Sequence, residues 1–298
     1  MEKTVNSWEE LMSLVYSDSW DVSLRRHRSK YVFRGLPRHN YNLIPSIDRI
    51  GKHSNLADIE RLLLSDFSQY ARSDASPGDS VWNWLAVAQH HGLPTRFLDW
   101  TYSPYVALHF ATENLGPDLL NDDAVIWCVN YMQTNESLPK LLKTKRNEFR
   151  KQVFSVEILE EAVKSLVELD RLSETPFLFF LEPPSLDARI VNQAALFSVM
   201  SRPAPYSYDD GQPRDSLDEY LRKEQLTRES NESPLFKKII VPAALKWEIR
   251  DKLDQANITE RVMYPGLDGL SSWLRRHYTK KPQDIRSEKV IAEASDRV

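Results

Sequence analysis

The chain has 298 residues, of which 41% are hydrophobic, and a formal net charge of -4 at pH 7. This composition supports a folded core and excludes a disordered chain, and the acidic balance excludes bulk electrostatic binding of nucleic acid, although a local basic patch could coexist with it. The single cysteine, Cys128, excludes an internal disulfide, and without zinc-type Cys/His spacing we expect a cytoplasmic protein that needs no metal. With no secretion signal at the N-terminus and no apolar window near the roughly 20 residues that cross a bilayer, we expect no membrane partner.

Apolar spacing in the first half predicts helices and strands in alternation. Helical spacing predicts helices over residues 7–18, 58–72, 81–88 and 103–114, with a basic helix start at 47–52. Stretches rich in β-branched and aromatic residues predict strands at 31–35 and 124–131, and residues between 25 and 30 form a basic, polar linker.

The second half continues this alternation. Charged and apolar residues mix at helical spacing over 138–172, which predicts a helical insertion that a sheet core does not require. Further strands are expected at 176–181, 194–199 and 237–242, and further helices at 217–226, 243–254 and 269–277. The chain has no Gly-rich phosphate-binding fingerprint, so the pattern indicates an α+β fold with an antiparallel or split sheet. We expect the charged tail, 281–298, to fray or to bind a partner.

The stretch from Gln89 to Thr101 reads QHHGLPTRFLDWT and joins two predicted helices. Its histidines, His90 and His91, suggest a metal site or a general base, but no third ligand lies at a suitable spacing, so a structural role is favoured. A Ser/His/Asp triad is also open, although no Gly-x-Ser-x-Gly turn supports it. Arg96, Asp99 and Thr101 alternate around apolar residues, which predicts a half-buried extended segment.

Arg34 ends an apolar strand and precedes Gly35. Its guanidinium suits a phosphate or carboxylate, and glycine permits close approach of a backbone, so an anionic ligand is one interpretation. A structural ion pair with Asp99 is the other. We expect Asp99, between two apolar residues, to be partly desolvated and to need Arg34 or Arg96 as a partner. Gln193 precedes an apolar strand and could hydrogen-bond at a cleft edge, but it cannot act as a base.

An ordered set of motifs spans about residues 31 to 273: Phe33-Arg34-Gly35, Leu43-x-Pro45-Ser46, the Gln89–Thr101 stretch, Arg189-Ile190-x-x-Gln193-x-x-x-Phe197 and Tyr264-Pro265-Gly266-Leu267-Asp268-Gly269-Leu270. Together they closely resemble the FRG domain, a bacterial and phage-associated family named for its Phe-Arg-Gly triplet. The layout is also similar to that of the ADP-ribosyltransferase superfamily. This resemblance implies a single large α+β domain over residues 1–280, with a split, mainly antiparallel sheet, N-terminal helices and helical insertions.

The same resemblance implies roles for named residues. Arg34 would bind the phosphates of NAD, Thr101 would orient the nicotinamide ribose, and Gln193 would stand near the position of a late glutamate. The residues implied to act in catalysis are Arg34, Asp99, Thr101 and Gln193, and those implied to bind the cofactor are Arg34, Gly35, His91, Thr95, Arg96, Trp100 and Phe197. A neutral glutamine cannot stabilise an oxocarbenium-like state, so either Asp99 or Glu182 supplies the carboxylate or the domain binds NAD without turnover.

The resemblance thus leads us to expect an NAD-dependent ADP-ribosyltransferase that uses NAD as a substrate and needs no metal. It would act as an intracellular toxin or an anti-phage defence effector on a macromolecular acceptor, RNA or protein, with an antitoxin or chaperone to restrain it. A non-catalytic module that binds a ligand or a partner is the main alternative. A third is a metal-dependent nuclease or hydrolase that uses His90, His91 and Asp99.

Overall fold

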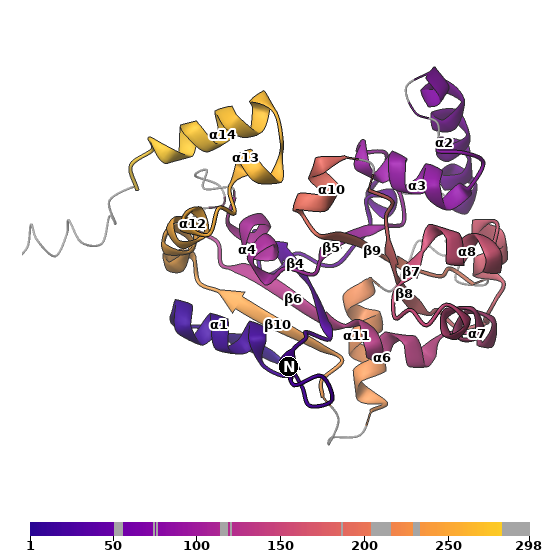
Figure 1. The fold of residues 1–298 in the computed structure, drawn as a ribbon, viewed down its shortest axis with the longest axis horizontal. Helices are drawn as coiled ribbons and strands as arrows, with labels where there is room; N and C mark the ends of the chain where they lie inside the picture. The colour runs from indigo at the N-terminus through magenta and orange to yellow at the C-terminus, as the bar shows by residue number, and fades with distance from the viewer. Residues whose placement is uncertain are drawn as a thin grey trace, which may run out of the picture.

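The computed structural model describes residues 1–50, 56–73, 75, 77–113, 119, 121–185, 187–203, 216–228 and 233–281, so nearly all of the predicted tail, 281–298, lies outside the described residues. Its central sheet is built from β1 (Glu2–Thr4), β4 (Tyr31–Leu36), β5 (Leu98–Thr101), β6 (Ala124–Asn130), β7 (Phe154–Ser155), β8 (Leu178–Glu182), β9 (Ala195–Met200) and β10 (Phe236–Val241). The strand order is β1-β10-β6-β4-β5-β9-β8-β7 (Figure 1). Pairing is antiparallel except at the two ends, where β1 joins β10 and β7 joins β8 in parallel. The predicted α+β class with a mainly antiparallel sheet is confirmed.

The helices lie mostly where apolar spacing predicts them. They are α1 (Trp8–Tyr16), α2 (Leu56–Tyr70), α3 (Val81–His90), α4 (Pro104–Thr112), α6 (Tyr131–Thr134), α7 (Lys140–Glu148), α8 (Val156–Ala162), α9 (Leu166–Asp170), α10 (Ala188–Asn192), α11 (Leu217–Leu226), α12 (Lys246–Gln255), α13 (Glu260–Met263) and α14 (Leu267–His277). Serine caps fix two of the starts, since Ser7 accepts from the N–H of Glu10 and Ser103 accepts from the N–H of Val106. Within the described ranges, no helix is long and apolar enough to cross a membrane.

The sheet is nearly divided between β4 and β5. These two strands pair through one residue couple, Phe33 with Thr101, whereas β4 pairs with β6 along its whole length. The sheet therefore consists of two halves, β1-β10-β6-β4 and β5-β9-β8-β7, joined by a narrow contact. Paired residues of neighbouring strands face the same side, so Phe33, Thr101 and the Asp99–Phe197 couple share one face.

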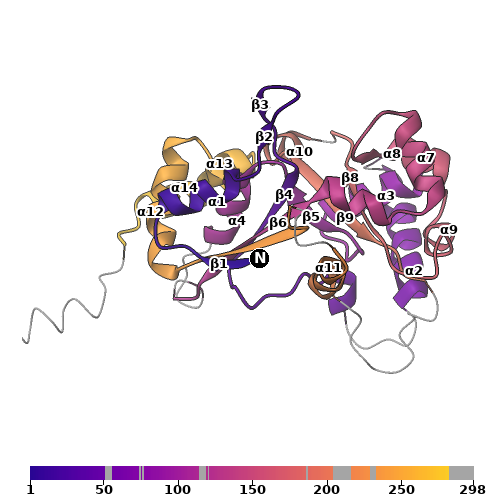
Figure 2. The same ribbon diagram turned by 90° about the horizontal axis from the view of Figure 1, so that it is seen from below.

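Separate hydrophobic cores cover that shared face over the two halves. One includes Phe33, Ala107 and Ile126 beneath α1, α4 and α12, and the other includes Trp82, Phe97 and Phe197 beneath α2, α3 and α8. Figure 2 shows these two groups of helices at opposite ends of the molecule, with α11 on the other side of the sheet from α10. A third core, under α11, spans both halves of the sheet. The shared face is therefore left uncovered by the two helical layers where the halves meet.

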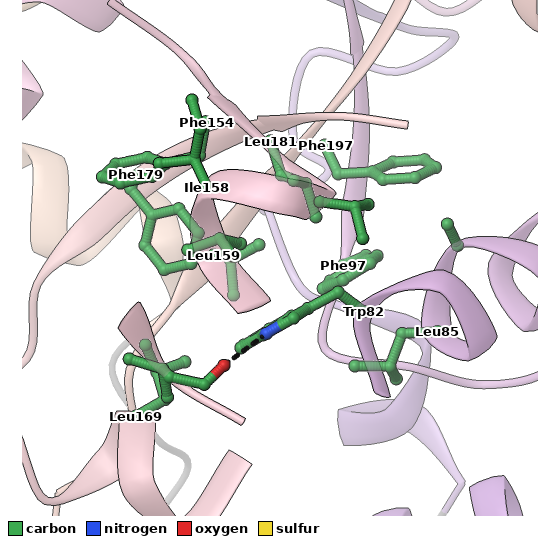
Figure 3. Close-up of a cluster of buried hydrophobic side chains, with 14 of the residues drawn as sticks. Trp82, Leu85, Phe97, Phe154, Ile158, Leu159, Leu169, Phe179, Leu181 and Phe197 are labelled. Atoms are coloured by element: carbon green, nitrogen blue, oxygen red, sulfur yellow. Dashed lines mark hydrogen bonds between the residues drawn. The ribbon is translucent and has the colours of Figure 1, made fainter. Parts of the chain in front are cut away.

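The segment 138–172 is helical as predicted, except that it also supplies β7 at the end of the sheet. Its side chains Phe154, Leu159 and Leu169 are buried against Trp82 and its neighbours (Figure 3). The indole N–H of Trp82 donates to the carbonyl of Val163 at 2.8 Å. This segment therefore completes the core over the β5-β9-β8-β7 half, and the expectation that the sheet core does not require it is wrong.

The sequence patterns did not predict the shortest helices and strands. The stretch expected to be a polar linker, 25–30, contains β3 (Arg26–His27), which forms a hairpin with β2 (Trp20–Asp21) before it, and β1 adds an exposed edge strand. A turn of helix, α10, precedes β9, because the carboxylate of Asp187 accepts from the N–H groups of Arg189 and Ile190 and starts a helix there. Elements this short contain too few residues for a periodic pattern.

Candidate functional site

A cavity of about 270 Å³ lies where the two halves of the sheet part. Its floor and walls come from β4, β5, β9 and α10, from the last turn of α3 and from the end of α4. Four predicted catalytic residues, Arg34, Asp99, Thr101 and Gln193, all line it. The structure therefore brings together residues that lie up to 159 positions apart in the chain, from Arg34 to Gln193 (193 - 34).

Arg34 spans the gap between the two halves. Phe33 and Gly35 face α4, so alternation along the strand directs Arg34 elsewhere, and its Nη1 donates to the backbone carbonyl of Asp99 on β5. The same nitrogen lies 3.9 Å from the Asp99 carboxylate, and the Arg34 side chain is 19% exposed. Burial lowers the pKa of the guanidinium, although Asp99 opposes the shift. Its Nε is buried with no hydrogen-bond partner among the described residues.

Gly35 has a packing role in addition to lining the cavity. A Cβ at this position would lie 1.8 Å from the carbonyl oxygen of Ala107 and 2.8 Å from the nitrogen of Ala111, both in α4. Glycine therefore lets β4 and α4 approach closely. The close backbone approach expected for a ligand is made by a helix instead.

Asp99 is held by a chain of hydrogen bonds inside the central motif. Gln89 donates to both carboxylate oxygens of Asp99 at 3.0 and 3.2 Å, and its own carbonyl accepts from the hydroxyl of Thr95 at 2.6 Å. The Asp99 side chain is 60% exposed, so the expected partial desolvation is wrong. The helices that cover the two halves of the sheet do not cover Asp99, and its carboxylate faces the cavity.

Arg96 is buried away from the cavity. Its guanidinium donates to Glu60 at 2.7 to 3.0 Å and to Asp170 at 2.8 Å, and the Arg96 and Glu60 side chains are each 1% exposed. Arg96 thus ties α2 and α9 to the motif, and of the two arginines considered as partners of Asp99 only Arg34 lies beside it. Thr95 and His91 likewise lie outside the cavity lining, so the structure does not bring these three implied cofactor ligands to it.

Thr101 and Gln193 line the cavity but already have protein partners. The Thr101 hydroxyl donates to the carbonyl of Gln193 at 2.7 Å and accepts from the N–H of Ser103 at 3.0 Å. The side-chain amide of Gln193 donates to the carbonyl of Met263 at 2.9 Å. These bonds fix the end of β5 to α10 and α13, so both residues shape the wall of the cavity.

Trp100 and Phe197, the remaining implied cofactor ligands, reach the cavity from buried positions. Trp100 meets Phe180 edge to face in the core under α11, and Phe197 stacks on Phe97 with ring centroids 5.0 Å apart. Glu182, considered as a carboxylate, lies outside the lining and accepts from the hydroxyl of Tyr102 at 2.7 Å.

Glu113 is a cavity residue that the sequence reasoning missed. Its carboxylate accepts from the hydroxyl of Tyr264 at 3.0 Å and lies 3.4 Å from Nε2 of His109. The Nη1 of Arg250 lies 2.9 Å from Nδ1 of His109, and as a donor there it would place the imidazole proton on Nε2, toward Glu113. The signal in the sequence was its position three residues after Phe110, on the same helical face. Phe110 also lines the cavity.

Arg189 is the second cation of the cavity, and its guanidinium lies 5.2 Å from the centre of the Tyr264 ring. His90 also lines the cavity, with Nε2 2.7 Å from the carboxylate of Asp187. Among the residues that the structure describes, no group of three or more His, Cys, Asp or Glu side chains is placed to hold a metal ion.

Comparison with known proteins supports the motifs up to Thr101, and the motifs at 189–197 and 264–270 lie outside the matched range. Residues 29–118 match the family model of the FRG domain, a range that contains Arg34, the Gln89–Thr101 stretch and Glu113. No curated protein and no solved structure gives a significant match to the chain. Residues 29–118, about a third of the chain, are therefore similar to the FRG domain family.

Proposed function

We propose that this protein is an NAD-dependent ADP-ribosyltransferase whose NAD site is the cavity at the split of the sheet. The observation that carries the proposal is the combination of groups on one cavity: the guanidinium groups of Arg34 and Arg189, the carboxylate of Glu113, and aromatic rings. A dinucleotide needs cations for its phosphates and flat apolar surfaces for its rings.

Arg34 and Arg189 supply the positive charge for the pyrophosphate. Arginine binds phosphate through two parallel N–H bonds, and the unpartnered Nε of Arg34 is a donor that a phosphate oxygen would satisfy. The rings of Phe110 and Phe197 provide apolar walls beside them.

Glu113 supplies the negative charge that Gln193 lacks. Cleavage of the bond between nicotinamide and ribose builds positive charge on the sugar, and a fixed carboxylate beside that charge lowers the barrier. The hydroxyl of Tyr264 holds the Glu113 carboxylate in place, so little reorganisation is needed. In this proposal the bond to nicotinamide breaks with its electron pair, and nicotinamide leaves as a neutral base.

The ADP-ribose then passes to a macromolecular acceptor, either RNA or protein. Loss of NAD and modification of cellular macromolecules both harm a cell, so the proposed activity fits a toxin or an anti-phage defence effector under the control of an antitoxin or chaperone.

The test uses NAD labelled on its adenosine part, cell extract and the purified full chain. The wild type is expected to label macromolecules in the extract, and Arg34→Ala is expected to lose this activity. Arg38→Ala is the matched control, because Arg38 lies just beyond β4 and pairs with Asp122 outside the cavity. No labelled product and no NAD loss in any extract would refute the proposal.

A second candidate is a module that binds NAD or a related ligand without turnover. It is favoured by the hydrogen bonds that already occupy the side chains of Asp99, Thr101 and Gln193. Calorimetry separates the two functions, since the module would bind NAD and release no nicotinamide.

A further inference from the structure

A second cavity of about 500 Å³ adjoins the first. The two share His90 and Arg189, and the second is otherwise formed by the start of α10 and by the turn from Tyr264 into α14. A transferase needs two neighbouring sites, one for the donor and one for the acceptor, and the shared residues stand where the two meet.

His90 lies where the two cavities meet, and its contacts leave it able to act as a base. Its Nε2 lies 2.7 Å from the Asp187 carboxylate, which fixes the proton on Nε2 and leaves the lone pair on Nδ1 free to accept a proton. The other oxygen of Asp187 accepts from the N–H groups of Arg189 and Ile190 at 2.8 and 3.1 Å, so the carboxylate cannot swing away. Burial acts to raise the pKa of Asp187, but these N–H groups and His90 outweigh it and the net pKa is lowered.

Resting on the proposed transferase function, we propose that the second cavity binds the acceptor, a hydroxyl-bearing side chain of a protein, and that His90 is its general base. The acceptor hydroxyl gives its proton to Nδ1 of His90 while its oxygen bonds to the ribose carbon. The bond from that carbon to nicotinamide breaks, and its electron pair leaves with nicotinamide, so charge and atoms balance. Asp187 is a positioning residue, because it acts through His90.

The charge of the second cavity favours protein over RNA. Its lining includes the carboxylates of Asp187 and Asp268, and Asp268 is exposed at the start of α14 with no ion pair to a described residue. Among the described residues of this lining, Arg189 carries the one guanidinium, and it also lines the first cavity, where we propose that it binds the pyrophosphate. A phosphate backbone would be repelled here, whereas a protein segment with basic residues beside its hydroxyl would be attracted.

The experiment measures two products from labelled NAD: nicotinamide release and label transferred to the protein or RNA fraction of a cell extract. His90→Gln keeps an amide donor for Asp187 but removes the base. We expect the ratio of label transferred to protein to nicotinamide released to fall by about 100-fold in this variant, the lower end of a general-base effect, because water can still accept the ribose when the base is lost. Asp187→Asn, which preserves the helix cap, should reduce the same ratio of transfer to release by a smaller factor.

His91→Gln is the matched control, because His91 is the adjacent histidine and lines neither cavity. It should leave both products unchanged. Equal loss of release and transfer in His90→Gln would overturn the role of His90 as a base, and label in the RNA fraction would overturn the protein acceptor. If the wild type releases no nicotinamide, the proposed function itself fails, and the acceptor site fails with it.

Discussion

Replacing Arg96 by methionine should destabilise the fold strongly. The variant keeps most of the apolar stem but removes a guanidinium that donates to Glu60 at 2.7 to 3.0 Å and to Asp170 at 2.8 Å. Glu60 is 1% exposed, so the change leaves a buried carboxylate without its main cation. Breaking a buried ion pair in this way costs about 3–5 kcal/mol, and we expect the free energy of unfolding to fall by that amount.

Urea unfolding followed by tryptophan fluorescence measures this loss. Arg38→Met is the matched control, because the Arg38–Asp122 pair is 34% and 42% exposed and such surface pairs contribute about 0.2–1 kcal/mol. A loss in Arg96→Met no larger than that of the control would refute the structural role of the buried pair. Because Arg96 lines neither cavity, the folded variant should still bind NAD with wild-type affinity.

Three further changes probe the packing, the buried charge and the cavity. Gly35→Ala would place a methyl carbon 1.8 Å from a carbonyl oxygen of α4, and we expect an overpacking loss of about 1–3 kcal/mol in the same unfolding assay, whereas wild-type stability would contradict the close approach. The arginines around Glu60 outweigh its burial and hold its pKa below the ordinary value of 4.5. The ionised Glu60 therefore contributes fully to the free energy of unfolding above pH 4.5, and this contribution is lost as the pH falls through the lowered pKa. Acid titration should therefore destabilise the wild type more than Arg96→Met, and equal slopes would count against the pair. Arg34→Lys keeps the charge but loses the two-donor geometry, so NAD turnover should fall at least about tenfold, which corresponds to about 1.4 kcal/mol. The control Arg38→Lys should leave NAD turnover unchanged.

The fold was largely predictable because its main elements carry strong periodic patterns. The run from Ala124 to Asn130 is buried along its whole length and reads as a central strand, and the Ser103-Pro104 start of α4 is a cap that sequence alone specifies. The hairpin of β2 and β3 was missed because each strand has two residues. The core role of segment 138–172 was missed because it depends on contacts with Trp82, far away in the chain.

The site was predictable only in part. The motifs indicated Arg34, Asp99, Thr101 and Gln193, which line one cavity. They did not show that Arg34 lines this cavity whereas Arg96 is buried away from it. Local sequence cannot make that distinction, since it is the approach of Glu60 from α2 that buries Arg96. The exposure of Asp99 depends in the same way on where the helical layers end.

Glu113 was missed for a similar reason. It follows a helix as an ordinary polar residue would, and its place in the cavity depends on the close packing of α4 against Gly35 and on the hydroxyl of Tyr264. Those contacts join segments that are 78 and 151 residues away along the chain (113 - 35 and 264 - 113). The spacing from Phe110 indicates the helical face on which Glu113 lies, but no local pattern predicts these contacts.

The most direct measurement of the central claim is the rate of nicotinamide release from NAD by the wild type and by Glu113→Gln. Glutamine keeps an acceptor for the hydroxyl of Tyr264 but removes the charge, so the rate should fall by at least about 100-fold while calorimetry shows NAD still bound. Glu182→Gln, a carboxylate outside the cavity, should leave the rate unchanged. Wild-type release by Glu113→Gln would contradict the account of this cavity as a reaction centre.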